Sequence, residues 1–268
     1  MKKTLLIILS VMVAAGWTSV QAQLINVQFV DNSVGNAYGG GGPAVEPSQV
    51  GGAVLVLSAT DMWNTIGSAL TPFTYSASPS GGSGGPYSLD YVNGWRSGVT
   101  VTIGTFQNSY NTVEPNWGST STFTATPVAN LMGAYISAKA PTYSPVTVSL
   151  AGLAPSANYE LVLYSAANAG AGNARTTDFT VNGNMLSSAW DGLTSTLSPG
   201  VDYVEYTGAT SDALGNLVIT FSGVGTAEGD LNGFQLVPVP VPEPSTFALV
   251  GAGMALLLGY NRRKALRA

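Results

Sequence analysis

The segment LAGLAPSANY, residues 150–159, joins two stretches in which apolar and polar residues alternate, at 146–150 and 159–165. Alternation with a period of two is typical of half-buried β-strands. Pro155 fixes its own φ angle and favours a turn, so we expect one strand to end at Leu150 and the next to begin at Tyr159. Leu153 should lie beneath the turn, and the Tyr159 hydroxyl can bond back to the turn backbone. The segment therefore predicts a corner between two β-strands.

The spacing Leu153-x-Pro155-x-x-x-Tyr159 resembles the tyrosine corner of Greek-key sandwiches, as in fibronectin type III domains. The element also occurs in larger jelly rolls, so the resemblance implies Greek-key topology rather than one family. The same alternation elsewhere predicts about ten short strands separated by turn signals. These strands are residues 24–30, 53–58, 99–106, 119–126, 146–150, 159–165, 178–181, 202–206, 216–221 and 232–237.

The fold class predicted from these segments is all-β: one antiparallel, jelly-roll-like β-sandwich over residues 23–237. Two short helices are expected, at 60–70 and 128–138. The glycine-rich stretches 39–42 and 79–86 are expected to be surface loops that cannot pack a core. The second stretch is an alternative domain linker, but the part of the chain before it is small for a core of its own.

The closing segment, a strand at 215–223 followed by 228–236 with an acidic loop and Leu-Asn-Gly-Phe-Gln-Leu, resembles the ends of malectin-like and galactose-binding-like jelly rolls. This resemblance implies that the last strand lies beside the first, at residues 25–30. It favours that fold and does not by itself imply sugar binding.

Composition excludes several kinds of site. The chain has no Cys and no His, which excludes thiolate nucleophiles, a Ser-His-Asp triad and a His-based zinc or iron site. Between Gln23 and Pro242 there are three basic and thirteen acidic residues, a formal charge of 3 − 13 = −10. A domain this acidic repels phosphate backbones, so we expect no nucleic-acid partner.

The N-terminal residues 1–22 are predicted to be a secretory signal peptide. Lys2 and Lys3 precede an apolar run over residues 5–15, and Val20-Gln21-Ala22 places small residues before a cleavage site at Gln23. An uncleaved membrane anchor is the alternative, although the run is shorter than the ~20 residues of a spanning helix.

The C-terminal segment has three parts in order. Residues 238–245 form a Pro-rich linker, which must be extended because each Pro fixes φ and lacks a donor. Residues 246–261 are predicted to be a short transmembrane helix, and residues 262–268 form a basic tail with Arg262, Arg263 and Lys264. Basic residues after an apolar helix favour retention on the cytoplasmic side, which leaves the preceding domain outside.

The motif Pro242-Glu243-Pro244, the apolar helix and the basic cluster together resemble the PEP-CTERM sorting signal of Gram-negative bacteria. The resemblance implies recognition by an exosortase in the inner membrane, cleavage near Pro-Glu-Pro, and association with exopolysaccharide and biofilm. An ordinary C-terminal anchor is the alternative and keeps the same topology. The signal specifies a location and leaves the activity open.

Two kinds of binding site are candidates in the domain. Asp31, Glu228 and Asp230 are candidate calcium ligands, if the first and last strands are neighbours. The alternative is a solvated acidic loop and no cofactor. Trp95 and Trp117 lie in turn-rich contexts and are candidate carbohydrate contacts, although packing roles are the alternative. Trp63 and Trp190 are expected in the core, with their indole N–H groups satisfied.

Carboxylate pairs at 202 and 205, or at 228 and 230, show no catalytic signature, since residues 202 and 205 of a strand point to opposite faces. The predicted function is therefore a non-enzymatic, exported cell-surface or matrix protein, with extracellular polysaccharide as an expected partner. A carbohydrate-binding module and a carboxylate-dependent polysaccharide-degrading enzyme are the alternatives.

Overall fold

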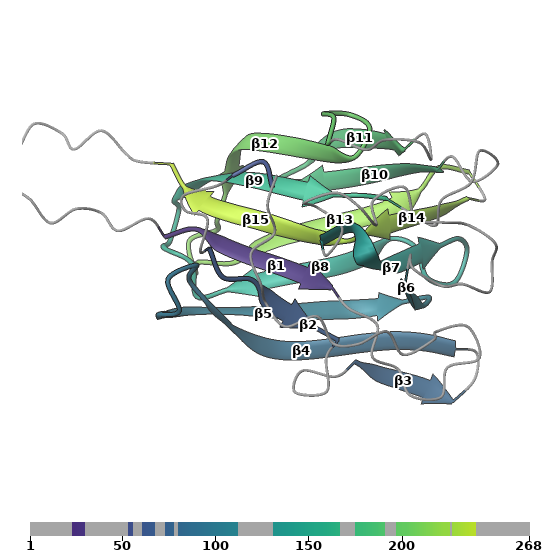
Figure 1. Cartoon of the computed structure of the whole chain (residues 1–268), viewed down its shortest axis with the longest axis horizontal. Helices are drawn as coiled ribbons and strands as arrows, with labels where there is room; N and C mark the ends of the chain where they lie inside the picture. Colours follow the sequence, from purple (N-terminus) through teal and green to yellow (C-terminus); the bar gives the residue numbers. More distant parts are fainter. Residues whose placement is uncertain are drawn as a thin grey trace, which may run out of the picture. The chain divides into compact units, whose positions relative to one another are not determined.

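The computed structural model describes residues 23–29, 53–55, 61–67, 73–77, 80–111, 131–166, 175–190, 197–225 and 227–239. The chain divides into a compact unit over residues 1–238 and a second unit over residues 239–268. In the described ranges, one short 3-10 helix, η2 (Leu131–Gly133), accompanies an otherwise all-β structure (Figure 1). None of the helices in this part of the chain is long and apolar enough to span a membrane.

The first sheet has five strands, and the first and last strands of the domain are neighbours in it. Its order is β12 (Tyr203–Thr210), β9 (Asn158–Tyr164), β15 (Gly233–Pro238), β1 (Ile25–Phe29) and β2 (Asn64–Ile66). β1 pairs antiparallel with β15, with Ile25 opposite Leu236, and parallel with β2. The prediction that the closing strand lies beside the opening strand is confirmed.

The second sheet has seven strands, and every neighbouring pair in it is antiparallel. Its order is β11 (Asn184–Trp190), β10 (Arg175–Val181), β13 (Leu217–Gly223), β8 (Val146–Ala151), β5 (Arg96–Phe106), β4 (Ser80–Asp90) and β3 (Thr74–Ala77). A small third sheet has the order β14 (Glu228–Leu231), β7 (Ala134–Lys139) and β6 (Ser109–Asn111).

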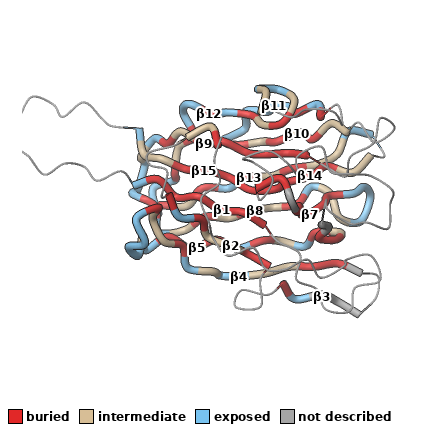
Figure 2. Tube along the Cα trace, viewed as in Figure 1, coloured by how far each residue is buried: buried red, intermediate tan, exposed pale blue. Residues whose placement is uncertain are grey.

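One apolar core lies between the two large sheets. Alternate residues of β8 are buried, as the period of two predicts, and the same holds for the start of β13. Side chains from both sheets meet in a single cluster, which makes the domain a β-sandwich. Figure 2 shows buried residues along the strands of both sheets. Members of this cluster include Val27, Val101, Val148, Leu161, Phe179, Ile219, Phe221, Phe234 and Leu236.

A second apolar cluster covers the other side of β9, so that β9 is buried on both faces along most of its length. It includes Trp63, Tyr135, Val162, Tyr164 and Trp190. The prediction that both tryptophans lie in the core is confirmed. The indole N–H of Trp190, however, which was expected to be satisfied, has no hydrogen-bond partner among the described residues.

The tyrosine corner is confirmed in detail. β8 ends at Ala151, β9 begins at Asn158, and Leu153 is buried in the core cluster. The backbone N–H of Ala154 donates a hydrogen bond to the Tyr159 hydroxyl oxygen at 2.9 Å. The turn and the first residues of β9 are thereby fixed to each other.

Both predicted helices are wrong. The 60–70 segment contains β2, which completes the five-stranded sheet beside β1. In residues 131–138, the described part of the second segment, only η2 is helical, and β7 follows it. The first five residues of β7 are all buried, so the segment lacks the alternation by which a half-buried strand is recognised. The described part of the predicted strand 53–58, residues 53–55, includes a bend and no strand.

The glycine-rich segment 79–86 is not a surface loop, because Ser80 onward belongs to β4. Gly81 and Gly82 are buried, and a Cβ on Gly82 would overlap the Phe106 ring. A Cβ on Gly81 would lie 2.6 Å from Cε1 of Tyr143. These glycines leave room for aromatic rings against the strand, so the segment packs the core and is no domain linker. The other glycine stretch, 39–42, lies outside the described residues.

Candidate functional site

The acidic segment predicted as a loop is strand β14, which pairs antiparallel with β7. The register places Glu228 directly opposite Lys139, and their side chains form an ion pair at 3.3 Å. Asp230 lies opposite Ser137 and is 1% exposed. The strand therefore carries one carboxylate at the surface edge and one inside the protein.

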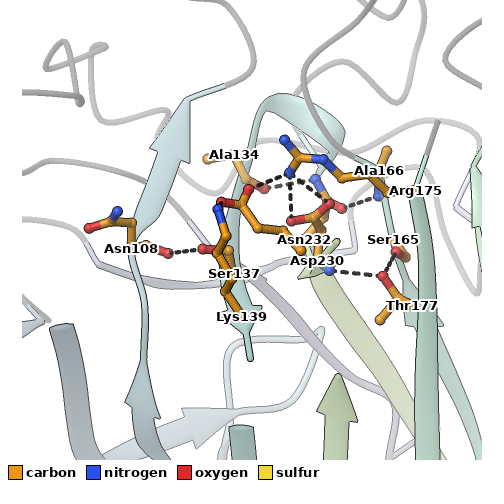
Figure 3. A network of polar contacts seen from close by, with 11 residues as sticks. Asn108, Ala134, Ser137, Lys139, Ser165, Ala166, Arg175, Thr177, Asp230 and Asn232 are labelled. Carbon is orange, nitrogen blue, oxygen red and sulfur yellow. Dashed lines mark hydrogen bonds and ion pairs between the residues drawn. The ribbon is translucent and has the colours of Figure 1, made fainter. Parts of the chain in front are cut away.

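Arg175, the first residue of β10, joins these two carboxylates (Figure 3). Its guanidinium Nη1 lies 2.7 Å from Oε2 of Glu228 and 3.3 Å from each carboxylate oxygen of Asp230. We call Arg175, Glu228, Asp230 and Lys139 the ion cluster. It links β10, β14 and β7 through side chains alone.

Burial governs the protonation of Asp230. Desolvation raises the pKa of its carboxyl from 3.8 to about 7, and the nearby charge of Arg175 opposes this rise while that of Glu228 adds to it. For Arg175, desolvation is the largest single effect and acts to lower the pKa, but Asp230, Tyr135 and Glu228 together outweigh it and the pKa is raised overall. The guanidinium is therefore permanently charged, and the proton uptake of the cluster belongs to Asp230.

Hydrogen bonds continue from the ion cluster into the protein interior. The Asp230 backbone N–H donates to Oγ1 of Thr177 at 2.8 Å, and the Ser165 hydroxyl donates to the same oxygen at 2.9 Å. Asn232, fully buried, accepts from the Ala166 N–H at 2.6 Å and donates to the Ala134 carbonyl at 2.9 Å (Figure 3). The cluster and Asn232 together connect β7, β9, β10 and β14.

The surroundings of the predicted calcium ligands differ from those of a calcium site. Glu228 and Asp230 are brought together, but Arg175 and Lys139 lie against them. Asp31 lies outside the described residues. No group of three or more Asp or Glu side chains that could hold a metal ion occurs within the described ranges. The arrangement of 228 and 230 is neither the predicted open loop nor a solvated one, since both residues are in a paired strand.

In the other carboxylate pair, Asp202 and Glu205, only Glu205 lies in strand β12, because the strand begins at Tyr203. Asp202 is fully buried and accepts a hydrogen bond from the Ser198 N–H at 2.8 Å. Glu205 is exposed on β12.

Trp95 is at the tip of the turn between β4 and β5 and is 75% exposed. Its backbone N–H donates to Oδ1 of Asn93 at 3.1 Å, and the Tyr91 N–H donates to the Trp95 carbonyl at 2.8 Å. The turn is therefore fixed while the indole ring is left in solvent. Trp117, the second candidate carbohydrate contact, lies outside the described residues.

Sequence reasoning missed Arg175 and the buried polar row on the outer side of the five-stranded sheet. In that row Gln235 donates to Oδ1 of Asn26 at 2.9 Å and its side-chain carbonyl accepts from the Tyr164 hydroxyl and the Leu55 N–H. The available signal for Arg175 was its rarity, because it is one of three basic residues in the domain. Nothing in the local pattern marks Gln235 or Asn26 as buried.

The sorting-motif residues Pro242, Glu243, Pro244, Arg262, Arg263 and Lys264 lie outside the described residues. Residues 240–264 match the family model of the PEP-CTERM protein-sorting motif, which confirms the resemblance seen in the sequence. No curated protein matches the chain.

Solved structures align with parts of the chain at low TM-scores. A family 35 carbohydrate-binding module from Clostridium thermocellum aligns at 18% identity over 39% of this chain and 77% of its own, with a TM-score of 0.26. The Cry4Aa toxin from Bacillus thuringiensis aligns at 16% identity over 41% and 19%, with a TM-score of 0.29. An exo-β-1,3-galactanase from Phanerochaete chrysosporium aligns at 13% identity over 66% and 43%, with a TM-score of 0.27. The chain spans less than half of the toxin and of the galactanase, and at these TM-scores the alignments carry no argument about activity.

Proposed function

We propose that this chain is an exported, non-enzymatic protein of the Gram-negative cell surface or extracellular matrix, delivered there by its PEP-CTERM motif. The observation that carries the proposal is the match at residues 240–264. The motif implies an exported protein that is anchored transiently in the membrane and processed by an exosortase. Biofilm or exopolysaccharide association is the proposed destination of the processed domain.

The chemistry of the domain supports a non-enzymatic role. In the first predicted carboxylate pair Asp202 is fully buried while Glu205 is exposed, and in the second Arg175 and Lys139 neutralise Glu228 and Asp230. General acid–base hydrolysis of a glycoside needs two carboxyl groups that face each other across a cleft. A stable acidic sandwich suits a matrix component.

We further propose a jelly-roll-like connectivity for the sandwich. From β8 onward the chain passes from the seven-stranded sheet to the five-stranded sheet at β9 and back again at β10. It crosses again from β11 to β12 and from β12 to β13. Repeated crossing between two antiparallel sheets is the arrangement of jelly rolls.

Carbohydrate binding is the second candidate function, and the observation that favours it is the exposed Trp95 ring. An exposed indole offers an apolar face for stacking and an N–H donor. Glycan-array binding that is lost in Trp95→Ala, with an unchanged melting temperature, would support this candidate. Trp117→Ala is the matched variant for the other predicted contact.

The sorting proposal is tested in a host that carries an exosortase. Deletion of residues 240–264 should abolish surface display and leave an unprocessed mass. Replacing Arg262, Arg263 and Lys264 with Ala should trap the chain before processing, because the basic cluster holds the end of the helix on the cytoplasmic side. Unchanged display and mass in the deletion variant would contradict the proposal.

A further inference from the structure

We propose that the end of the sandwich from which the chain leaves β15 is a membrane-facing surface that rests on lipid headgroups while the chain is anchored. This exit end consists of the turns 91–98, 152–157 and 212–216 and the neighbouring residue Met62. The inference rests on the membrane anchoring in the proposed function. The inference assigns a contact surface and a partner, the bilayer, to a protein whose location is proposed from the sorting motif.

Both ends of the domain lie together at the exit end. The register of β1 and β15 places Ile25 opposite Leu236, so the chain enters and leaves side by side (Figure 1). The turn 91–95 adjoins the entry, because the Val92 N–H donates to the Leu24 carbonyl at 3.0 Å. The tyrosine corner adjoins the exit, because Pro238 pairs with Tyr159.

Close backbone contacts join the three turns into one surface. A Cβ on Gly152 would overlap the Gly98 carbonyl, and a Cβ on Gly215 would overlap the Leu153 carbonyl. The Leu153 N–H also donates to the Gly215 carbonyl at 3.0 Å. Glycine is required at Gly152 and Gly215 for these approaches, and both have a positive φ angle. The turns that carry Trp95 and Leu214 therefore flank a shared corner.

The exit end carries exposed apolar side chains that no described residue covers. Trp95 is 75% and Leu214 is 82% exposed, and Met62 is also exposed. These three are among the eight exposed large apolar residues in the described part of the chain. A Cβ on Gly94 would lie 3.2 Å from Sδ of Met62, so Met62 belongs to the same turn surface as Trp95.

Local hydrogen bonds hold the turn in which Leu214 is exposed. The carboxylate of Asp212 accepts from the Leu214 N–H at 2.8 Å and from the Asn216 N–H at 2.7 Å. The turn is fixed with its leucine at the tip. A fixed apolar tip costs little ordering entropy when it enters an apolar surface.

The chemistry of Trp95 and its neighbour suits the headgroup region. Tryptophan gathers at membrane interfaces because its ring is apolar and its N–H is polar. Arg96 follows it with a side chain that is 81% exposed and lies 3.8 Å from Asp90. An exposed guanidinium can bind a lipid phosphate. The other two basic residues of the domain, Lys139 and Arg175, are held in the ion cluster.

The length of the chain beyond β15 keeps this end close to the bilayer. Eight residues, 239–246, separate Pro238 from the apolar stretch that starts at Phe247. A Pro-rich chain extends about 3.1 Å per residue, so the linker reaches roughly 25 Å at most. Headgroups on one side of a bilayer occupy roughly 5–8 Å of that distance. The linker is therefore long enough to cross the headgroup layer and short enough to hold the exit end near the lipid surface.

A bilayer fits the surface better than a polysaccharide does. A sugar platform needs one or two aromatic rings beside hydrogen-bonding groups. Leu214 and Met62 add aliphatic surface that binding to a sugar does not require and that insertion at the acyl boundary of a bilayer does. The two partners give opposite results in the experiment below.

The absence of cysteine in the chain permits single-cysteine labelling of the full-length protein. Four variants are reconstituted separately into phosphatidylethanolamine–phosphatidylglycerol vesicles and labelled with an environment-sensitive fluorophore: Trp95→Cys, Leu214→Cys, Val224→Cys and Met254→Cys. Val224 is the matched exposed control, because it follows the far end of β13. Met254 lies in the apolar stretch and reports the anchor.

Brominated lipid should quench the labels at 95, 214 and 254 at least twofold more than the label at 224. If only the label at 254 is quenched, the exit-end inference is wrong and the anchor stands. If the label at 254 is not quenched, the anchoring itself is wrong. Emission at 95 that responds to polysaccharide fragments and not to bromolipid would assign the surface to sugar. Quenching that rises with the number of protein molecules per vesicle and not with the content of brominated lipid would assign the surface to a second copy of the chain. A response to polysaccharide alone and a response to protein density alone would each overturn the inference.

Discussion

Replacing Arg175 with Met isolates the energetic role of the ion cluster. The guanidinium is 2.7 Å from Glu228 and 3.3 Å from both oxygens of Asp230, whose side chain is 1% exposed. Removing one partner of a buried pair leaves an uncompensated charge, at a cost of about 3–5 kcal/mol. The loss should be smaller at pH 5 than at pH 8, because Asp230 can then take up a proton.

Urea unfolding at pH 8, followed by tryptophan fluorescence, measures the free energy of unfolding. Lys139→Met is the matched control: its pair with Glu228 is 3.3 Å long but the lysine is 45% exposed, so a loss of about 0–1 kcal/mol is expected. The double variant Arg175→Met/Asp230→Leu should recover most of the loss, since an apolar pair of similar volume needs no compensation. Equal losses in Arg175→Met and Lys139→Met would refute the reasoning from burial.

Three further predictions concern stability. Burial raises the pKa of Asp230 to about 7, so the folded protein holds a proton that the unfolded chain releases above pH 3.8. The free energy of unfolding should therefore fall as pH rises from about 4 to about 7, by at most about 1.4 kcal/mol per pH unit, and a slope that persists in Asp230→Asn would assign it to another group. Tyr159→Phe leaves the Ala154 N–H without its partner and should cost about 1–3 kcal/mol by chemical denaturation, and no loss would mean that water replaces the hydroxyl. Gly82→Ala drives a methyl group into the Phe106 ring and should cost about 1–3 kcal/mol, whereas Gly208→Ala, whose Cβ meets no atom within 4 Å, should stay within about 0.5 kcal/mol; similar melting temperatures for the two would contradict the packing argument.

The sequence predicted those features whose causes are local. The corner at 150–159 depends on Leu153, Pro155 and Tyr159, which lie within seven residues of one another, and it is found as expected. The period of two likewise located β8 and β13, since each has one face toward the core. The charge count indicated that basic residues were rare in the domain.

Features that depend on distant partners could not be read from the sequence. Arg175 and Asp230 are 55 residues apart, and only the pairing of β14 with β7 and the position of β10 bring them together. β7 is buried on both sides and so lacks alternation. Gly81 and Gly82 look like loop residues until Phe106 and Tyr143 are placed above them. In each case the deciding neighbour is set by sheet order, which a local pattern does not contain.

The distribution of the three basic residues connects the fold to the proposed location. Lys139 and Arg175 form ion pairs with Glu228 and Asp230, and Arg96 is the one basic residue of the domain outside the ion cluster. Arg96 lies beside Trp95 at the end where the domain continues into the sorting tail. An acidic domain repels an anionic membrane, and the exit end itself carries Asp90 and Asp212 beside Arg96, so its exposed apolar side chains must supply the attraction to the bilayer. The same charge arrangement lets the domain leave the surface readily once the tail is cut, because a single tryptophan turn and a leucine tip hold it far more weakly than a spanning helix does.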